Sequence, residues 1–257
     1  MRVAPLVLLA LFGLAPAASA QGLFGASPNQ PPRDDKTGTN PLNLQQQVDV
    51  SNTYFKLDTF YLDTATYRHA FPVFNRRVRV AGLVPFGYSN LTGRSEGGLG
   101  DLGADVEWTP WLSSRGGLVA GLRTTWNTAT TDGLGLGGAN TLMPYAQYVA
   151  QLSPTLLVAP FVGQRVSAGG DEFATPYNDT LLGATVVWRV TPRVWVSSTP
   201  QWLVDHEGDR AYGDVGGEVG VLVRRQFSAY VRPSIGVGRQ NDKPYDWGLA
   251  AGLRIVP

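Results

Sequence analysis

The feature that most constrains this chain is a strict alternation of apolar and polar residues, which is clearest between Gly100 and Asn127. The two arms GADVEW (residues 103–108) and LVAGLRTTW (residues 118–126) place apolar side chains at nearly every second position, with acidic, basic or glycine residues at several of the positions between. A period of two is that of a β-strand, whose successive side chains point to opposite faces. Because the polar stretch SSRGG between the arms is typical of a turn, this region predicts an antiparallel hairpin with one apolar and one charged face.

The same period recurs from Leu44 to the C-terminus, and no stretch there predicts a helix. The other alternating stretches span residues 44–55, 59–70, 76–86, 141–152, 156–168, 181–190, 194–205, 214–224, 227–239 and 246–256. Together with the two arms of the hairpin they make about twelve strands, so the fold class is predicted to be all-β.

Turns of two lengths separate these strands. Short turns fall near positions 73, 114, 154, 192 and 225, at intervals of 33 to 41 residues. Long polar loops lie between them and span residues 87–98, 128–140, 169–179, 206–213 and 240–245. Short periplasmic turns that alternate with longer outer loops, on strands of about ten residues, are typical of outer-membrane barrels. A propeller repeats at a similar length, but each of its blades holds four strands, whereas each interval here holds two.

The charged face indicates which side of the sheet is the interior. Burying its ionisable residues in a dry soluble core would cost several kcal/mol for each group. A wet lumen for this face, with lipid against the valine and leucine face, removes that cost. The residues expected to line the lumen are Asp101, Asp105, Glu107, Arg123, Arg165, Arg189, Asp214, Glu218, Arg232 and Arg254. The sequence therefore predicts a transmembrane antiparallel up-and-down β-barrel of about twelve strands, surrounded by the lipid of a bacterial outer membrane.

The N-terminal part of the chain has a different composition. Residues 1–20 resemble a secretory signal, because Arg2 precedes an apolar run and Ala18-Ser19-Ala20 fits a cleavage site. The apolar run is shorter than the roughly 20 residues that span a bilayer, which favours cleavage over a retained anchor. Residues 21–43 are rich in Pro, Gly, Asn and Gln and are expected to form a flexible periplasmic leader or a plug, ahead of a barrel domain over residues 44–257.

Charge and composition exclude several function classes. Lys and Arg number 21 and Asp and Glu 20, so loss of Arg2 with the signal leaves a formal charge of zero. A neutral chain provides no electrostatic attraction for nucleic acid. No cofactor or metal is expected, and the glycine-rich stretches GLGDLG and GLGLGG lack the Lys-Ser/Thr of a phosphate loop.

Short motifs resemble those of a known family. The stretch GLGDL at residues 98–102 is followed within one strand by Trp108, and the loop at residues 128–138 reads TATTDGLGLGG. Asp246-Trp247 begins the last strand, which closes on Pro257, whereas many outer-membrane chains end in an aromatic residue. In these motifs the chain resembles the bacterial outer-membrane β-barrel "transporter" family, close to the barrels linked to the MetA pathway of phenol degradation. The resemblance covers the predicted barrel domain and implies a transport role, without implying any binding residues.

Two groups of polar residues have competing interpretations. Asp205-His206-Glu207 lies where a strand meets a loop, and His206 is a candidate catalytic base of the kind that barrel hydrolases place near the rim. The alternative is a solvated loop, which we favour because a base needs an oriented partner and none is visible. Asp101 and Asp105 would form a cation-selective constriction or pair with Arg123, and the compensation of acids by arginines in a lumen favours pairing.

Three prolines break the strand pattern. Pro160, Pro200 and Pro233 each follow a short turn by about six or seven residues, on three alternate strands. Proline cannot donate to the ladder, so each position predicts either a bulge or kink, which we favour, or a local opening of the wall through which an apolar molecule could leave sideways.

The leading functional hypothesis is a porin-like barrel that passes small solutes, in particular hydrophobic or aromatic ones, and that is not an enzyme. Eight strands leave a lumen filled by side chains and 16 to 18 leave a water channel, so about twelve predict a narrow or partly plugged path. The alternatives are an outer-membrane hydrolase that uses His206 and a structural barrel without transport.

Overall fold

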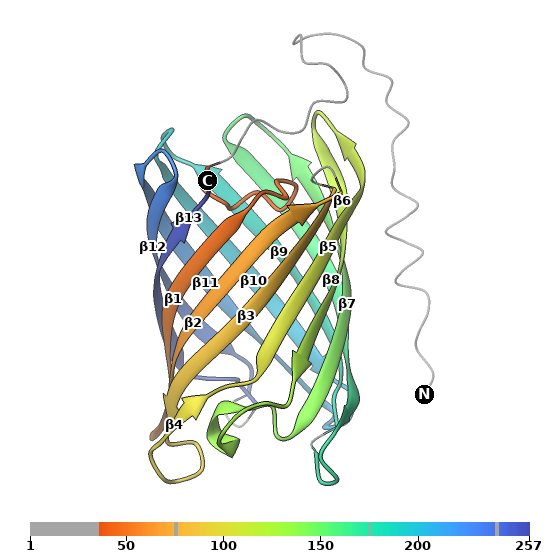
Figure 1. Cartoon of the computed structure of the whole chain (residues 1–257), viewed down its shortest axis with the longest axis vertical. Helices are drawn as coiled ribbons and strands as arrows, with labels where there is room; N and C mark the ends of the chain where they lie inside the picture. The colour runs from red at the N-terminus through yellow and green to blue at the C-terminus, as the bar shows by residue number, and fades with distance from the viewer. Residues whose placement is uncertain (1–35, 75–76, 175, 240–241) are drawn as a thin grey trace.

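The computed structural model describes residues 36–74, 77–174, 176–239 and 242–257, so the expected signal and most of the expected leader lie outside the described residues. The described chain forms a closed antiparallel β-barrel (Figure 1). Its twelve wall strands are β1 (Gln47–Leu57), β2 (Phe60–Val73), β3 (Val78–Ser89), β5 (Leu102–Ser113), β6 (Gly116–Trp126), β7 (Ala139–Gln151), β8 (Leu156–Gly170), β9 (Asn178–Arg189), β10 (Val194–Asp205), β11 (Arg210–Arg224), β12 (Phe227–Val237) and β13 (Trp247–Ile255). The predicted all-β barrel of about twelve strands is confirmed.

Neighbouring strands in the sequence pair with one another, and β1 pairs with β13 to close the ring. The short strand β4 (Glu96–Leu99) forms one end of the wall strand that continues as β5, at the bottom of the barrel in Figure 1. The partner of β3 is β4 as far as Leu99 and β5 from Gly103 onward, so only Gly100 to Leu102 interrupt the ladder. Among the described residues, no helix is both long and apolar enough to span a membrane.

The two ends of the barrel differ in the length of their connections. One end carries the C-terminus, the start of the described chain at Lys36 and the short turns at residues 114–115, 152–155, 190–193 and 225–226, which identifies it as the periplasmic end. The other end carries the longer loops, including residues 127–138 with a single 3₁₀ turn at Asp132–Leu134. The expected long loop at residues 206–213 is shorter than predicted, because β11 begins at Arg210 and leaves a connection of only residues 206–209.

The apolar rows of the strands face outward. Trp108 is 52 % exposed and Val106 is 42 % exposed, whereas Asp105, which precedes Val106 and points to the opposite face, is 2 % exposed. Outward aromatic side chains lie near the strand ends, where Tyr54 contacts Trp247 with ring centroids 5.4 Å apart. Such a continuous apolar surface is stable against acyl chains and would aggregate in water. This surface on a closed barrel defines a transmembrane protein of the bacterial outer membrane.

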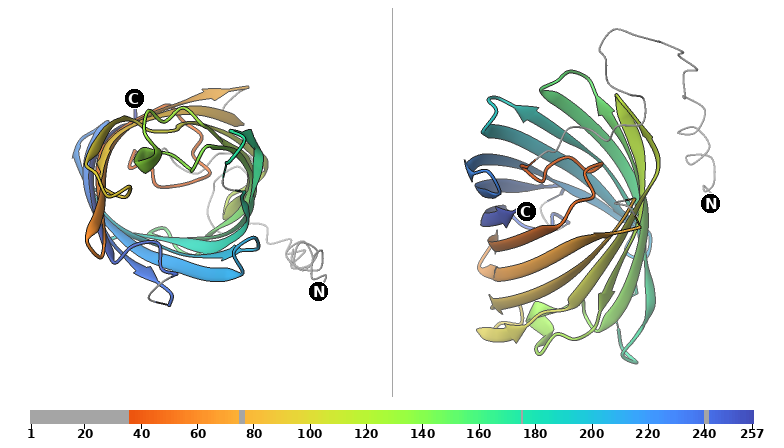
Figure 2. Two further views of the ribbon diagram at one scale, coloured as in Figure 1. Left: turned by 90° about the horizontal axis from the view of Figure 1, so that it is seen from below. Right: turned by 45° about the horizontal axis from the view of Figure 1, so that its top comes forward.

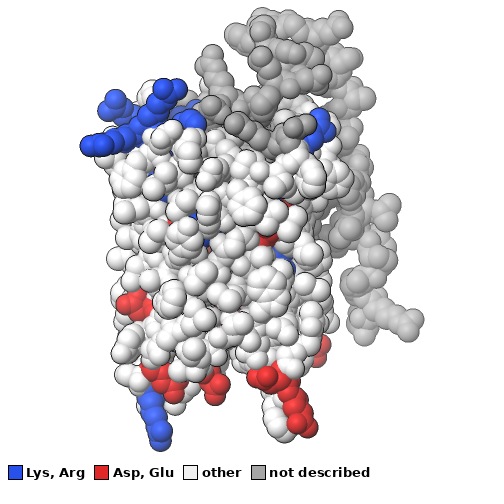
Figure 3. All heavy atoms as spheres, in the orientation of Figure 1, with Lys and Arg blue, Asp and Glu red and all other residues white. Residues whose placement is uncertain are grey.

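On the face shown in Figure 3, most charged side chains lie at the two rims, and only a few charged atoms are visible between them. Exposed arginines such as Arg77, Arg115 and Arg225 lie at the periplasmic turns. Acidic residues such as Asp171 and Glu207 lie in the outer loops. The largely uncharged band between the rims matches the hydrocarbon layer, in which an exposed charge is costly.

An arginine on the outer face should destabilise the barrel according to its depth. Val106→Arg places a charge near the middle of β5 and is expected to lower the free energy of unfolding by about 2–4 kcal/mol. Val223→Arg, on the same face but near the periplasmic end of β11, should cost about 0–1 kcal/mol because its guanidinium reaches the headgroups. Urea titration of the protein refolded in lipid vesicles measures both values. Equal losses at the two depths would contradict the assignment of the outer face to lipid.

Candidate functional site

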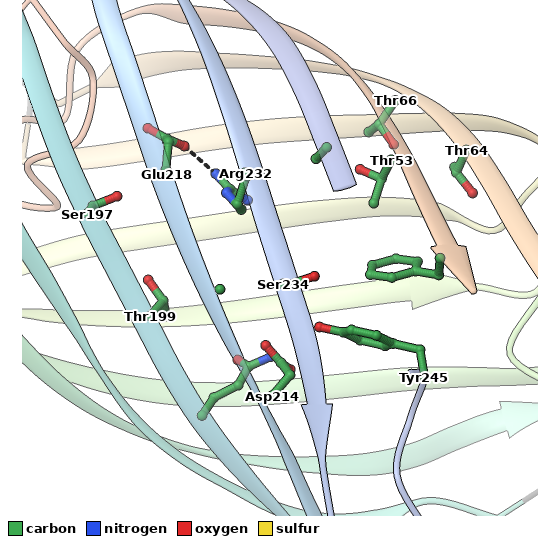
Figure 4. A pocket seen from close by; sticks show the side chains of 14 residues that line it. Thr53, Thr64, Thr66, Ser197, Thr199, Asp214, Glu218, Arg232, Ser234 and Tyr245 are labelled. Atoms are coloured by element: carbon green, nitrogen blue, oxygen red, sulfur yellow. Dashed lines mark hydrogen bonds and ion pairs between the residues drawn. The ribbon is translucent and has the colours of Figure 1, made fainter. Parts of the chain in front are cut away.

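One side of the lumen contains a cavity of about 630 Å³. It is bounded by β1 and β2 on one flank and by β10 to β13 on the other, and Tyr245 enters it from the last loop (Figure 4). The period of two explains its lining, since alternate residues of β11, namely Asp214, Gly216 and Glu218, all face inward. The remaining lining residues are Thr53, Phe55, Thr64, Thr66, Ser197, Thr199, Gln201, Arg232, Ser234 and Ala250.

The outer part of the cavity combines an aromatic pair with a carboxylate. The rings of Phe55 and Tyr245 are tilted against each other with centroids 4.5 Å apart. Gln201 Nε2 donates to Asp214 at 2.6 Å. The Tyr245 hydroxyl hydrogen-bonds with Asp214 and Ser234. Burial raises the pKa of the Tyr245 phenol above its ordinary value, so the phenol stays neutral at pH 7.

The inner part of the cavity ends on a compensated charge network. Glu218 accepts a hydrogen bond from Arg232 at 2.6 Å and another from the indole N–H of Trp195 at 2.7 Å. Beneath it, Arg254 lies 3.5 Å from Glu218 and donates to Asp49 at 2.9 Å. Each buried carboxylate therefore has a cationic partner, as the desolvation of charge requires.

A second network covers the opposite wall. Asp105 accepts from Arg123 at 2.8 Å and lies 3.5 Å from Arg68. Glu107 pairs with Arg79 and accepts from the hydroxyl of Tyr145 at 3.0 Å. The structure thus places Asp105 beside Arg123, which is the pairing that the sequence favoured over a constriction. Asp101 takes no part in this network.

Asp101 instead holds the outer loop at residues 127–138. Its carboxylate accepts hydrogen bonds from the backbone N–H groups of Thr128, Ala129 and Leu136, at 3.0, 3.0 and 2.6 Å. Three such bonds from one loop fix its conformation at the outer mouth. Asp101 is therefore a structural residue of the loop in this arrangement.

The remaining expected lumen residues are dispersed along the barrel. Arg165 donates to Asp179 at 2.7 Å near the outer end, with its guanidinium 4.4 Å from the ring of Tyr177. Arg189 is half-buried at the periplasmic end of β9. Of the ten residues chosen from the sequence, only Asp214, Glu218 and Arg232 line the cavity.

Sequence reasoning missed the uncharged residues of the cavity, because the selection was made on ionisable side chains alone. The hydroxyl groups of Thr53, Thr64 and Thr66 lie on the inward face that the period of two assigns to them. That alternation was a sufficient signal for their orientation. Tyr245 had no such signal, since it lies in a loop outside the strand pattern.

The segment at residues 36–46 runs through the periplasmic end of the barrel (Figure 2). Leu42 is 6 % exposed and packs in an apolar cluster with side chains of β6 to β9. The carbonyl oxygen of Thr37 accepts a hydrogen bond from Arg254 at 2.9 Å. Lys36 Nζ donates to the carbonyl oxygen of Pro257 at 3.0 Å. These contacts hold the segment against both flanks of the lumen.

Pro160, Pro200 and Pro233 are exposed on the outer face of β8, β10 and β12. Each is paired with the following strand. The ladder with the preceding strand lacks two residue pairs at the proline. The register is the same on both sides of each gap, so no extra residue forms a bulge there. The gap follows from the missing N–H of proline.

His206 is exposed in the connection between β10 and β11. Its Nε2 lies 2.8 Å from the hydroxyl of Thr180, which itself donates to Gln164 at 2.7 Å. Asp205 accepts from Arg210 at 2.7 Å and from the backbone of the turn, and no contact joins it to the imidazole. Since the Thr180 proton is directed to Gln164, His206 is placed to donate to this hydroxyl rather than to activate it. Among the described residues, no group of three or more His, Asp or Glu side chains could hold a metal ion.

Known structures share this fold. An outer-membrane channel from Pseudomonas putida F1 has a TM-score of 0.66 and 14 % identity, and the match covers 87 % of this chain and 99 % of that one. The porin NanC has a TM-score of 0.61 at 11 % identity, with 82 % and 100 % covered. The porin KdgM has a TM-score of 0.59 at 8 % identity, with 82 % and 99 % covered. No protein-family model and no curated protein matches the sequence. The chain therefore has the fold of outer-membrane channel barrels.

Removing one member of the inner charge network should destabilise the barrel. Arg254→Ala leaves Asp49 and Glu218 buried with one partner fewer, and we expect the free energy of unfolding to fall by about 3 kcal/mol. This value is the lower end of the range for a broken buried ion pair, because each acid keeps another hydrogen-bond partner. Arg225→Ala, an exposed arginine at a periplasmic turn, should change it by less than about 0.5 kcal/mol. Urea unfolding of the two variants in vesicles gives the comparison. The same unfolding midpoint for both variants would show that the network contributes nothing to the stability of the barrel.

Proposed function

We propose that this protein is a channel that passes small solutes across the bacterial outer membrane. The observation that carries the proposal is the polar cavity of about 630 Å³ inside a lipid-facing barrel. A barrel that served only as a structural element would gain stability from a packed or fully compensated lumen. The cavity volume lies in the range of about 300–1,000 Å³ that small-molecule sites have. The shared fold with outer-membrane porins supports the same assignment.

The ten ionisable residues expected from the sequence would then act in two ways. Asp214, Glu218 and Arg232 would contact the solute in the cavity. The others would keep the lumen polar and would fix its width through the networks around Asp105 and Arg254.

We propose further that residues 21–43 provide a periplasmic plug, of which the described part is residues 36–43. The burial of Leu42 against the inner face of β6 to β9 supports this role, because a segment inside a twelve-strand lumen occupies a large part of its cross-section. Passage of a solute to the periplasm then requires this segment to move.

The plug predicts a change in conductance on a single substitution. Leu42→Asn buries an amide in the apolar cluster and should loosen the segment, so single-channel conductance in planar bilayers should rise above that of the mature chain. Deletion of residues 21–43 should raise it at least as much. Gln46→Asn, at an exposed position of the same segment, is the matched control and should leave it unchanged. Unaltered conductance in the first two variants would rule out the plug, and no conductance or solute uptake in any of them would favour a structural barrel.

The chemistry of the cargo is a separate question. The hydrophobic or aromatic solutes expected from the sequence, and the relation to barrels of the MetA pathway of phenol degradation, stay proposals. The gaps in the ladder beside Pro160, Pro200 and Pro233 support a lateral route for an apolar cargo, since the wall there has fewer hydrogen bonds to break.

The lateral route predicts an effect on apolar solutes alone. Replacing the three prolines by alanine restores the N–H groups and should let the ladder close at each gap. Uptake of a small arene into proteoliposomes, corrected for empty vesicles, should then fall, while uptake of a polar solute that uses the lumen should be unchanged. If arene uptake stays the same in the triple variant, the prolines are only local interruptions of the sheet.

A further inference from the structure

We infer that the cavity selects uncharged, polyhydroxylated ring compounds of monosaccharide type. This inference rests on the proposed channel function and specifies its substrate class. It is carried by three features of the cavity: unpartnered hydroxyl groups, an aromatic pair beside a hydrogen-bonding carboxylate, and one acidic charge that no cation compensates.

Hydroxyl groups dominate the lining. Seven side chains carry one, and they come from both flanks of the cavity: Thr53, Thr64, Thr66, Ser197, Thr199, Ser234 and Tyr245. The hydroxyls of Thr53, Thr64, Thr66 and Ser197 make no hydrogen bond with any described residue. A hydroxyl both donates and accepts, so these groups can match a solute hydroxyl in either direction.

The unpartnered hydroxyls also exclude apolar molecules from this route. Water satisfies them when no solute is present, and a solute without polar groups would displace that water without replacing its hydrogen bonds. A site that is built to bind a hydroxyl rejects the analogue that lacks it far more strongly than an apolar pocket rejects an extra hydroxyl. A polyhydroxylated solute restores each lost bond as it moves along the wall.

The outer part of the cavity fits a saturated ring. The tilted pair of Phe55 and Tyr245 presents apolar surface on which the C–H face of a sugar ring can pack. Asp214 lies beside Tyr245, and its carboxylate already accepts from Gln201 and Tyr245. A carboxylate has about four lone-pair positions, so Asp214 can also accept from hydroxyls of a ring.

The charge of the cavity disfavours anions. Arg232 is paired with Glu218, so these two cancel each other. Among the described residues, Asp214 has only the uncharged partners Gln201 and Tyr245, and it leaves the cavity with one negative charge. A second negative charge about 4 Å away in a wet environment costs roughly 1 kcal/mol or more. The cavity thus differs in expected selectivity from KdgM, a porin whose structure was determined in complex with oligogalacturonate.

The test is a swelling assay with proteoliposomes that contain the mature chain, meaning residues 21–257 without the expected signal, or its Leu42→Asn variant. The solutes are glucose, glucuronate and tetra-O-methylglucose, which share one ring but differ in charge and in hydroxyl donors. We expect glucose to enter at least about fivefold faster than glucuronate, the ratio that corresponds to roughly 1 kcal/mol of repulsion. The methylated ring should also enter more slowly than glucose.

Variants assign these preferences to the cavity. Asp214→Asn should bring the entry rate of glucuronate to within about twofold of that of glucose, because the substitution removes the repelling charge. The asparagine side chain has nearly the same shape and can still hydrogen-bond with hydroxyl groups. Asp209→Asn, an exposed acid in the outer connection between β10 and β11, is the matched control and should leave the ratio unchanged. The double variant Thr64→Val, Thr66→Val should lower the rate at which glucose enters. In this background Asp214→Asn should still raise the entry rate of glucuronate relative to that of glucose.

The outcomes separate the two proposals. Entry of the three solutes at rates that follow size alone, in the mature chain and in Asp214→Asn, would overturn the substrate class and leave the channel intact. Entry of none of them, even with the Leu42→Asn variant, would overturn the channel itself.

Discussion

The whole structure depends on the pairing of β1 with β13. In a bilayer an unpaired N–H or carbonyl group costs several kcal/mol, so a membrane-spanning sheet must have no free edge. The chain closes its sheet over the nine pairs from Val48–Ile255 to Lys56–Trp247. Asp49 and Arg254 are directly opposed across this seam, and their side chains form an ion pair on its inward face. Closure therefore creates the lumen, and lumenal charge in turn stabilises the closure.

Twelve strands leave a lumen that must be filled in part. Side chains from opposite walls do not meet across it as they do in a barrel of eight strands. The chain fills one side with the network around Asp105 and Glu107, and it fills the periplasmic end with residues 36–46 and the buried ring of Trp195. What remains is the cavity between β1–β2 and β10–β13. The functional space is thus the part of the cross-section that neither a charge network nor the N-terminal segment occupies.

Local sequence was sufficient for the strands and insufficient for the site. The period of two predicted the strands and their lipid and lumen faces, because orientation in a strand depends on nearest neighbours alone. The partners of a lumenal side chain depend instead on strand tilt and stagger. Arg254 on β13 reaches Glu218 on β11, which is not an adjacent strand, and no spacing in the sequence indicates this contact. The same limit applies to Asp101, which lies on the polar face but is drawn to the backbone of a loop by three N–H groups. The hydroxyl lining was predictable in orientation, since it follows the alternation, but a choice based on charge passed over it.

The two mouths of the barrel are held by different kinds of contact, and this difference favours opening at the periplasmic end. At the outer mouth, Asp101 binds three backbone N–H groups of the long loop at residues 127–138, and Asp205 binds two in the short connection at residues 206–209, so both connections are fixed to the wall. At the periplasmic mouth, residues 36–46 belong to no strand and are held by side-chain packing, such as that of Leu42, and by hydrogen bonds, such as that from Arg254 to Thr37. Segments outside a hydrogen-bonded ladder open at a lower free energy than strands of a closed ladder. Because the wall cannot open at its seam without exposing backbone to lipid, we expect movement of this segment to be the least costly way to connect the cavity to the periplasm in the proposed channel.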